Sequence, residues 1–106
     1  MRRLDTVYRN VRLFEVDFDY PNVVANGTVS QDFSTTASFP VGTHIIQWGF
    51  GEAAGVLEDL IIQFKFVDTD TLRMVLENPT GGAIDGGTIL TQFVTGEFNT
   101  DLIETI

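Results

Sequence analysis

The sequence predicts an all-β fold, an antiparallel two-sheet β-sandwich with an extended N-terminal arm. The jelly roll is one strand connectivity that fits this prediction. Apolar and polar residues alternate along most of the 106-residue chain, and turn residues interrupt this alternation every 8–14 residues or so, by rough count. No window combines helical spacing with a cap and a stop. Because one open sheet would leave an apolar face uncovered, six or seven short strands predict two packed sheets.

Alternation with a period of two defines each predicted strand. The clearest example runs from Phe14 to Tyr20, where apolar residues occupy one face and three acids occupy the other. Further strands are expected at 28–33, 44–50, 56–67, 72–76 and 88–95, with a short last strand around 102–106. Asp68-Thr69-Asp70 has turn composition, which predicts a hairpin there, and the segment 52–60 has room for a one-turn helix.

The segment from Leu60 to Val67 is apolar on both faces except at Gln63 and Lys65. Such a strand is an aggregation hazard when it lies at an exposed sheet edge. We therefore expect it to be central in its sheet or covered by another subunit. A domain of this size is also marginally stable alone, which favours a homo-oligomer.

The charge divides the chain into two parts. Residues 1–12 carry four arginines and one aspartate, a net charge of +3, whereas residues 13–106 carry −12, which together make the total of −9. We expect residues 1–12 to be a basic arm and residues 13–106 to be the sandwich domain. The arm predicts a partner-binding segment built on Arg2, Arg3, Arg9 and Arg12, and the alternative interpretation is a frayed, solvated terminus.

Composition excludes several functional classes. The chain has no cysteine, so disulfides, thiolate metal sites and cysteine nucleophiles are absent. A strongly acidic body repels phosphate backbones, which makes nucleic acid an unexpected partner. The N-terminus lacks the apolar stretch of a secretory signal, and the longest apolar run is too short to cross a bilayer, so we expect no membrane association.

The candidates for chemistry are few, and each has a simpler explanation. His44 has no nucleophile and orienting acid placed beside it by the sequence, so we expect a structural histidine at a strand end. Asp17 and Asp19 share a strand face, where they suit solvent contact better than glycoside hydrolysis or a divalent cation. Asp68 and Asp70 fit a turn better than a calcium loop. The sequence therefore predicts no enzyme, no metal and no cofactor.

Two further signals have both a structural and a functional interpretation. Asn26-Gly27-Thr28 matches an N-glycosylation sequon, but without a secretion signal the turn interpretation is preferred. Trp48 and the nine phenylalanines are able to form a platform for sugar stacking, yet alternation assigns most of them to core faces.

The stretch from Phe64 to Asp85 resembles small β-sandwich modules of tailed-bacteriophage virion proteins. The shared order is a strand, a tight polar turn with Asp70-Thr71, a second strand and the loop Asn78-Pro79-Thr80-Gly81-Gly82-Ala83-Ile84-Asp85. Upstream, the segments 18–21, 26–28 and 40–46 are similar to the opening strands of those modules. The chain departs from them at Thr43-His44, where an acidic residue commonly follows the glycine.

This resemblance implies a virion structural protein, most directly a capsid decoration or cement protein that stabilises the shell through protein–protein contacts. It also implies a location in the virion after synthesis in the host cytoplasm, contact with the major capsid protein or other virion proteins, and a homotrimer. The alternative is a carbohydrate- or receptor-binding module of a phage fibre, with Trp48 or Tyr20 stacking on sugar. A small acidic enzyme using Asp17 and Asp19 is a third hypothesis.

Overall fold

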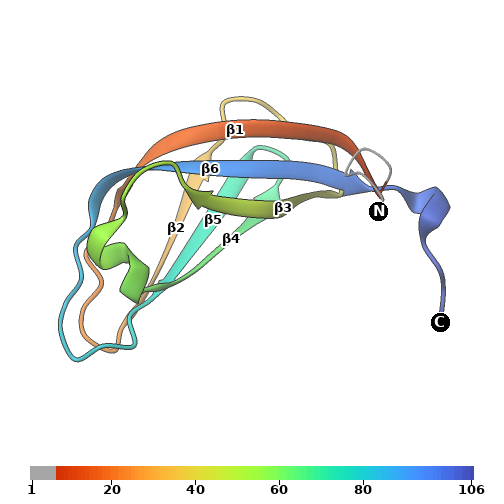
Figure 1. Ribbon diagram of the computed structural model, residues 1–106. Helices are drawn as coiled ribbons and strands as arrows, with labels where there is room; N and C mark the ends of the chain where they lie inside the picture. Colours follow the sequence, from red (N-terminus) through yellow and green to blue (C-terminus); the bar gives the residue numbers. More distant parts are fainter. Residues whose placement is uncertain (1–6) are drawn as a thin grey trace.

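The computed structural model describes residues 7–106, and within them six strands and two short 3-10 helices follow one another (Figure 1). The strands are β1 (Tyr8–Tyr20), β2 (Thr28–Ser34), β3 (Thr43–Phe50), β4 (Ile61–Asp68), β5 (Thr71–Glu77) and β6 (Gly87–Phe98). The 3-10 helices are η1 (Gly55–Asp59) and η2 (Thr100–Leu102).

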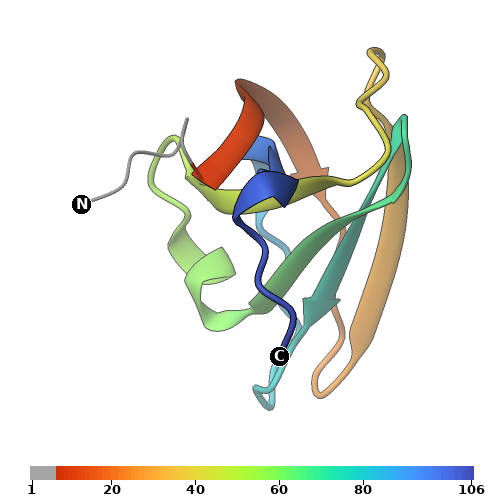
Figure 2. The same cartoon turned by 90° about the vertical axis from the view of Figure 1, so that its right-hand side faces the viewer.

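The strands form two antiparallel sheets of three strands each. One sheet has the order β1-β6-β3 and the other the order β2-β5-β4, and Figure 2 shows them as two layers. This confirms the predicted all-β class with two antiparallel sheets. The six described strands are fewer than the eight of a jelly roll, so that wiring is not confirmed.

The long pair of β1 and β6 begins earlier in the chain than the alternation predicted. Tyr8 lies opposite Phe98 and Tyr20 lies opposite Gly87, with a register shift between Arg9 and Arg12. Residues 8–12 of the predicted arm therefore lie in β1, while Arg2 and Arg3 lie outside the described residues. The proposed boundary between residues 12 and 13 falls inside this strand.

Aromatic side chains from both sheets meet in one core. Phe18 of β1 stacks on Phe33 of β2 with ring centroids 4.3 Å apart. Phe64 of β4 meets Phe93 of β6 edge to face at 4.9 Å, and Phe93 also stacks on Phe14 at 4.9 Å. Offset and edge-to-face arrangements of this kind add to the free energy of area burial.

The strand β4 occupies an edge, which corrects the expectation of a central place. The centre belongs to β5, whose inward side chains Leu72, Met74 and Leu76 are almost fully buried. The predicted hairpin of β4 and β5 is confirmed, with a register shift after Phe66. The expectation of a central place was wrong because alternation shows which face a side chain occupies but not which strand lies beside it.

Two of the predicted strands, at 56–67 and 102–106, also differ from the structure. The expected strand at 56–67 begins at Ile61, because η1 precedes it and buries Leu57, as the one-turn helix allowed. The expected last strand at 102–106 is absent from the described residues, where η2 is followed by an exposed segment without regular structure.

The loop after β5 is organised by the buried side chain of Asn78. Its Nδ2 donates to the backbone oxygens of Val23, Val24 and Gly82, at 3.0, 3.2 and 2.8 Å. Its Oδ1 accepts from the backbone nitrogen and the hydroxyl of Thr80, at 2.9 and 2.7 Å. This one amide therefore joins the loop to the turn before β2.

Candidate interaction surface

The two described arginines of the predicted partner-binding set have contacts within the chain. Arg9 forms an exposed ion pair with Asp101, with Nη2 2.6 Å from Oδ2. The guanidinium of Arg12 lies 4.2 Å from the ring centroid of Phe39, which is a cation–π arrangement. Both side chains remain exposed to solvent, so the intramolecular contacts leave part of each guanidinium open to a partner.

The histidine predicted to be structural lies at the start of β3. The ring of His44 is tilted against Phe98 with centroids 4.5 Å apart, and Phe98 also stacks on Tyr8 at 5.6 Å. This small aromatic group lies where β1, β6 and β3 end together. Its members are half-buried or exposed, which makes it part of the outer surface of the sheet.

The paired acids lie on solvent-facing positions, as their alternation indicated. Asp17 and Asp19 are exposed on β1, on the face away from the core. In the turn between β4 and β5, Asp68 Oδ1 accepts from the backbone nitrogen of Thr69 at 2.7 Å, a local contact inside the predicted turn. Among residues 7–106, no group of three or more possible ligands is arranged to hold a metal ion.

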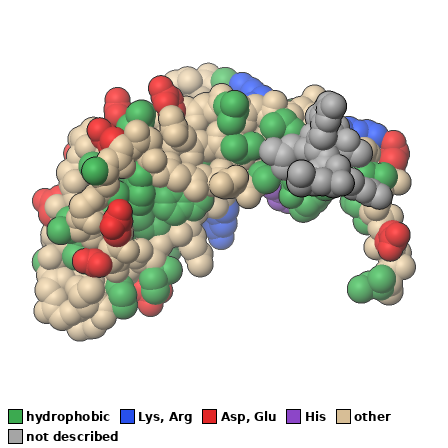
Figure 3. All heavy atoms as spheres, viewed as in Figure 1, with side chains coloured by type: hydrophobic (Ala, Val, Ile, Leu, Met, Phe, Trp, Pro, Cys, Tyr) green, Lys and Arg blue, Asp and Glu red, His purple; other side chains and the backbone are tan. Residues whose placement is uncertain are grey.

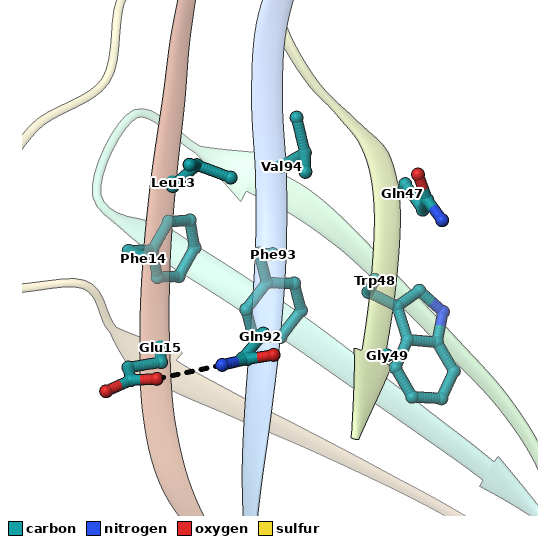
Figure 4. A pocket seen from close by; sticks show the side chains of 9 residues that line it. All are labelled: Leu13, Phe14, Glu15, Gln47, Trp48, Gly49, Gln92, Phe93 and Val94. Atoms are coloured by element: carbon teal, nitrogen blue, oxygen red, sulfur yellow. Dashed lines mark hydrogen bonds between the residues drawn. The ribbon is translucent and has the colours of Figure 1, made fainter. Parts of the chain in front are cut away.

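A shallow hollow of about 550 Å³ lies over the sheet β1-β6-β3 (Figure 4). The register places Leu13, Val94 and Gln47 in one row across the three strands, and Glu15, Gln92 and Gly49 in the next row on that face. Figure 4 shows the hydrogen bond from Gln92 Nε2 to Glu15 Oε2, which is 3.1 Å long.

The hollow combines apolar side chains with amide and carboxylate groups. Leu13 is 80% exposed, which is unusual for a leucine within a strand. Sequence reasoning missed this surface because the predicted strand began at Phe14 and left Leu13 outside it. The available signal was the position of Leu13 directly beside Phe14, since neighbouring residues of a strand face opposite sides.

The two residues considered for sugar stacking point toward the core. Tyr20 is 1% exposed, and its hydroxyl lies 2.6 Å from that of Thr91, so it is closed to a ligand. Burial raises the pKa of Tyr20 above its usual range, and the Thr91 hydrogen bond opposes this shift. Trp48 is half-buried and meets Phe64 edge to face at 4.9 Å.

The outer face of the second sheet carries a row of charged side chains. Asp32, Arg73 and Lys65 lie opposite one another on β2, β5 and β4. Arg73 donates from Nε and Nη2 to the two carboxylate oxygens of Asp32, at 2.7 and 3.0 Å. This hydrogen bond lowers the pKa of Asp32, with a further contribution from the charge of Lys65. Lys65 and Arg73 are the only cations between residues 13 and 106.

Charge and apolar exposure are unevenly distributed over the surface. Figure 3 shows many acidic side chains at the end of the molecule away from the termini. Large apolar side chains are exposed at several places, on strands, on a loop and in the C-terminal segment: Leu13, Val41, Ile61, Val67, Phe98, Leu102, Ile103 and Ile106. Scattered exposure of this kind is ordinary, but at a free sheet edge it provides a contact surface.

Comparisons with protein-family models, with curated proteins and with solved structures give no match for this chain. None of the helices in residues 7–106 has the length and apolar character that crossing a membrane requires. The site is therefore defined by its geometry alone, as a set of contact surfaces on two small sheets.

Proposed function

We propose that this protein is a virion structural protein, a capsid decoration or cement protein that acts through protein–protein contacts. The observation that supports this most is the apolar strand β4 at a free sheet edge, whose own residues Ile61 and Val67 are exposed. An edge of this kind exposes a solitary domain to aggregation, whereas in an assembly it pairs with a strand of another subunit. The virion and the homotrimer come from the sequence resemblance.

The proposal includes a β-sandwich body and a basic docking segment. The shared aromatic core between the two sheets supports the sandwich. Arg2 and Arg3 would make contact with an acidic surface of a neighbouring virion protein, assisted by Arg9 at the start of β1. Tyr8–Arg12 is paired with β6, so only the residues before β1 are available as a separate arm.

Co-sedimentation with tailed-phage capsids tests the proposal. We expect the purified protein to pellet with mature capsids, and the Arg2→Glu/Arg3→Glu variant to bind at least about tenfold more weakly, since reversing two charges opposes the docking. Deleting residues 1–12 is a poorer test, because it also removes paired strand residues. Equal capsid binding by the unmodified protein and the double variant would contradict the docking segment. The absence of any capsid binding would contradict the decoration function.

A matched pair of variants separates the charge of Arg9 from its ion pair. Arg9→Gln and Asp101→Asn both break the contact between Arg9 and Asp101, but only the first removes a cation. If Arg9 contacts a partner, Arg9→Gln weakens capsid binding and Asp101→Asn does not. Equal loss in both variants would assign Arg9 a purely intramolecular role.

The hollow over β1-β6-β3 favours a second candidate, the carbohydrate- or receptor-binding module. It offers the amides of Gln47 and Gln92 and the carboxylate of Glu15 beside apolar Leu13 and Val94, a mixture that suits a polar ligand with an apolar face. A glycan array tests it, with Gln47→Ala and Glu15→Gln as variants that spare the core. Binding that both variants leave unchanged would remove this candidate.

A further inference from the structure

We propose that two copies of this chain pair through their β4 strands, antiparallel across a two-fold axis at Phe64, to form one continuous six-stranded sheet. In the described residues β4 has a partner on one side only, since the sheet order is β2-β5-β4. Its other edge presents backbone groups without a strand beside them, which is the template that strand addition uses.

The edge of β4 borders a hollow that it shares with β3 of the other sheet. A hollow of about 350 Å³ lies along it, lined by residues 45–48 of β3, residues 62–65 of β4, and Val75. The side chains that border it from the two sheets include Ile45, Trp48, Ile62 and Phe64. An incoming strand beside β4 would cover these apolar groups, which are half-buried in the single chain.

One register makes the strand complementary to itself. With Phe64 opposite its own copy, Ile62 lies opposite Phe66 of the second copy, and Gln63 lies opposite Lys65. Core-facing residues then meet core-facing residues, and solvent-facing residues meet solvent-facing ones. Moving the axis to Lys65 would instead place two like charges directly opposite each other, and the axis at Phe64 avoids this repulsion.

The charge distribution supports the same edge. Two copies with a net charge of −9 each repel one another over most of their surfaces. Lys65 and Arg73 are the only cations of residues 13–106, and both lie on the outer face beside this edge. Lys65 therefore reduces the repulsion between two copies where the β4 strands meet.

A pair of charge variants tests the register in solution, with light scattering and sedimentation over a range of concentrations. The unmodified 106-residue chain should form dimers. Gln63→Glu should tighten the dimer by about two- to tenfold, because it places a carboxylate opposite each Lys65, and Gln63→Lys should loosen it by a similar factor. Net charge alone predicts the reverse order, since Gln63→Glu makes each copy more acidic.

Disulfide trapping tests the geometry directly, because the chain has no cysteine of its own. Gln63→Cys protein is mixed with Lys65→Cys protein and oxidised. Residues directly opposite each other suit a disulfide, whereas like positions in two copies lie about 8 Å apart on the diagonal and do not. The mixed disulfide should therefore exceed the statistical share, and Ser30→Cys on the opposite edge strand β2 should not cross-link.

Each outcome is decisive for the pairing. A monomer at all concentrations, a trimer, a tighter dimer with Gln63→Lys, or disulfides at their statistical ratio would overturn it. The pairing replaces the homotrimer that the sequence resemblance implies, and it does not depend on the proposed role in the virion. A dimer that does not bind capsids would contradict the decoration role and support the β4 pair. A monomer that binds capsids would support the decoration role and contradict the β4 pair.

Discussion

At the scale of single residues, the hydroxyl pair of Tyr20 and Thr91 is the clearest polar feature of the core. The two oxygens are 2.6 Å apart, and both side chains are buried. Burial penalises the ionised phenolate, which is why the pKa of Tyr20 is raised. The pair therefore links the stability of the fold to alkaline pH.

Replacing Tyr20 by phenylalanine removes this link. The folded-state pKa lies above the unfolded value of about 10, so the protonated phenol contributes stability below that pH, and the contribution is lost as pH rises through the raised pKa. We expect Tyr20→Phe to cost about 1 kcal/mol at pH 7. Urea unfolding between pH 8 and 11 should show a shallower alkaline decline for this variant than for the unmodified protein.

The matched control is Tyr8→Phe, because Tyr8 is half-buried beside Phe98 rather than enclosed in the core. It should leave most of the alkaline decline in place. Identical pH profiles for the unmodified protein and Tyr20→Phe would show that the buried phenol does not control this region.

Prediction from sequence was uneven at this scale. Alternation correctly assigned Phe18 and Tyr20 to the core, because burial on one face of a strand leaves a periodic signal. Asn78 left no such signal, since two of its five hydrogen bonds reach Val23 and Val24, more than fifty residues away in the chain. Leu13 was missed because a local pattern does not show which apolar residues stay uncovered.

At the scale of elements, η1 is held in place by one leucine that packs on a glycine. Leu57 is 1% exposed, and a Cβ atom added at Gly86 would lie 2.2 Å from Leu57 Cδ2. The loop before β6 therefore passes η1 more closely than a side chain at position 86 permits.

The substitution Gly86→Ala tests this close approach. We expect a loss of about 1–3 kcal/mol in the free energy of unfolding, because Leu57 or the backbone must move. In a Leu57→Ala background the same substitution should cost less, with a coupling of about 1 kcal/mol or more. Urea unfolding of the four proteins measures this cycle.

Gly81→Ala provides the control, since a Cβ there meets no atom within 4 Å. Its cost should stay within about 0.5 kcal/mol. Strictly additive effects at positions 57 and 86 would contradict the contact between η1 and the loop.

The strands show what alternation predicts and what it leaves open. All six described strands overlap predicted ones, with ends that differ by up to six residues, as at the start of β1, and the strand expected at 102–106 is not among them. Apart from the predicted hairpin of β4 and β5, the neighbours of the strands did not follow from the pattern, because side-chain period is a property of one strand and sheet order is a property of the whole fold. The edge position of β4 is the main example, and it became the basis of the interaction surface.

At the scale of the whole molecule, the net charge of −9 works against the compact state. The acids that cause this repulsion are largely exposed, on strands and in loops, and Figure 3 shows many of them on one side of the surface. Added salt screens the repulsion between exposed charges that lie farther apart than the Debye length, which is about 10 Å at 0.1 M and shorter at higher salt.

Raising the ionic strength should therefore stabilise the fold. Between about 0.01 and 0.5 M sodium chloride we expect the free energy of unfolding to rise by roughly 1 kcal/mol or less. The variant Asp17→Asn/Asp19→Asn should show a weaker dependence on salt, because two exposed acids of β1 are removed. Thermal or urea unfolding at several salt concentrations measures both, and a fall in stability with salt would contradict the argument.

The pairing of β1 with β6 determines the order in which this molecule can fold. These are the first and the last of the described strands, and Tyr8 faces Phe98 across the whole intervening chain. The hairpin of β4 and β5 needs only a two-residue connection and can close while the rest is still unfolded. During synthesis the sheet β1-β6-β3 has to wait for its central strand, so β1 and β3 leave the ribosome without the partner that each of them needs.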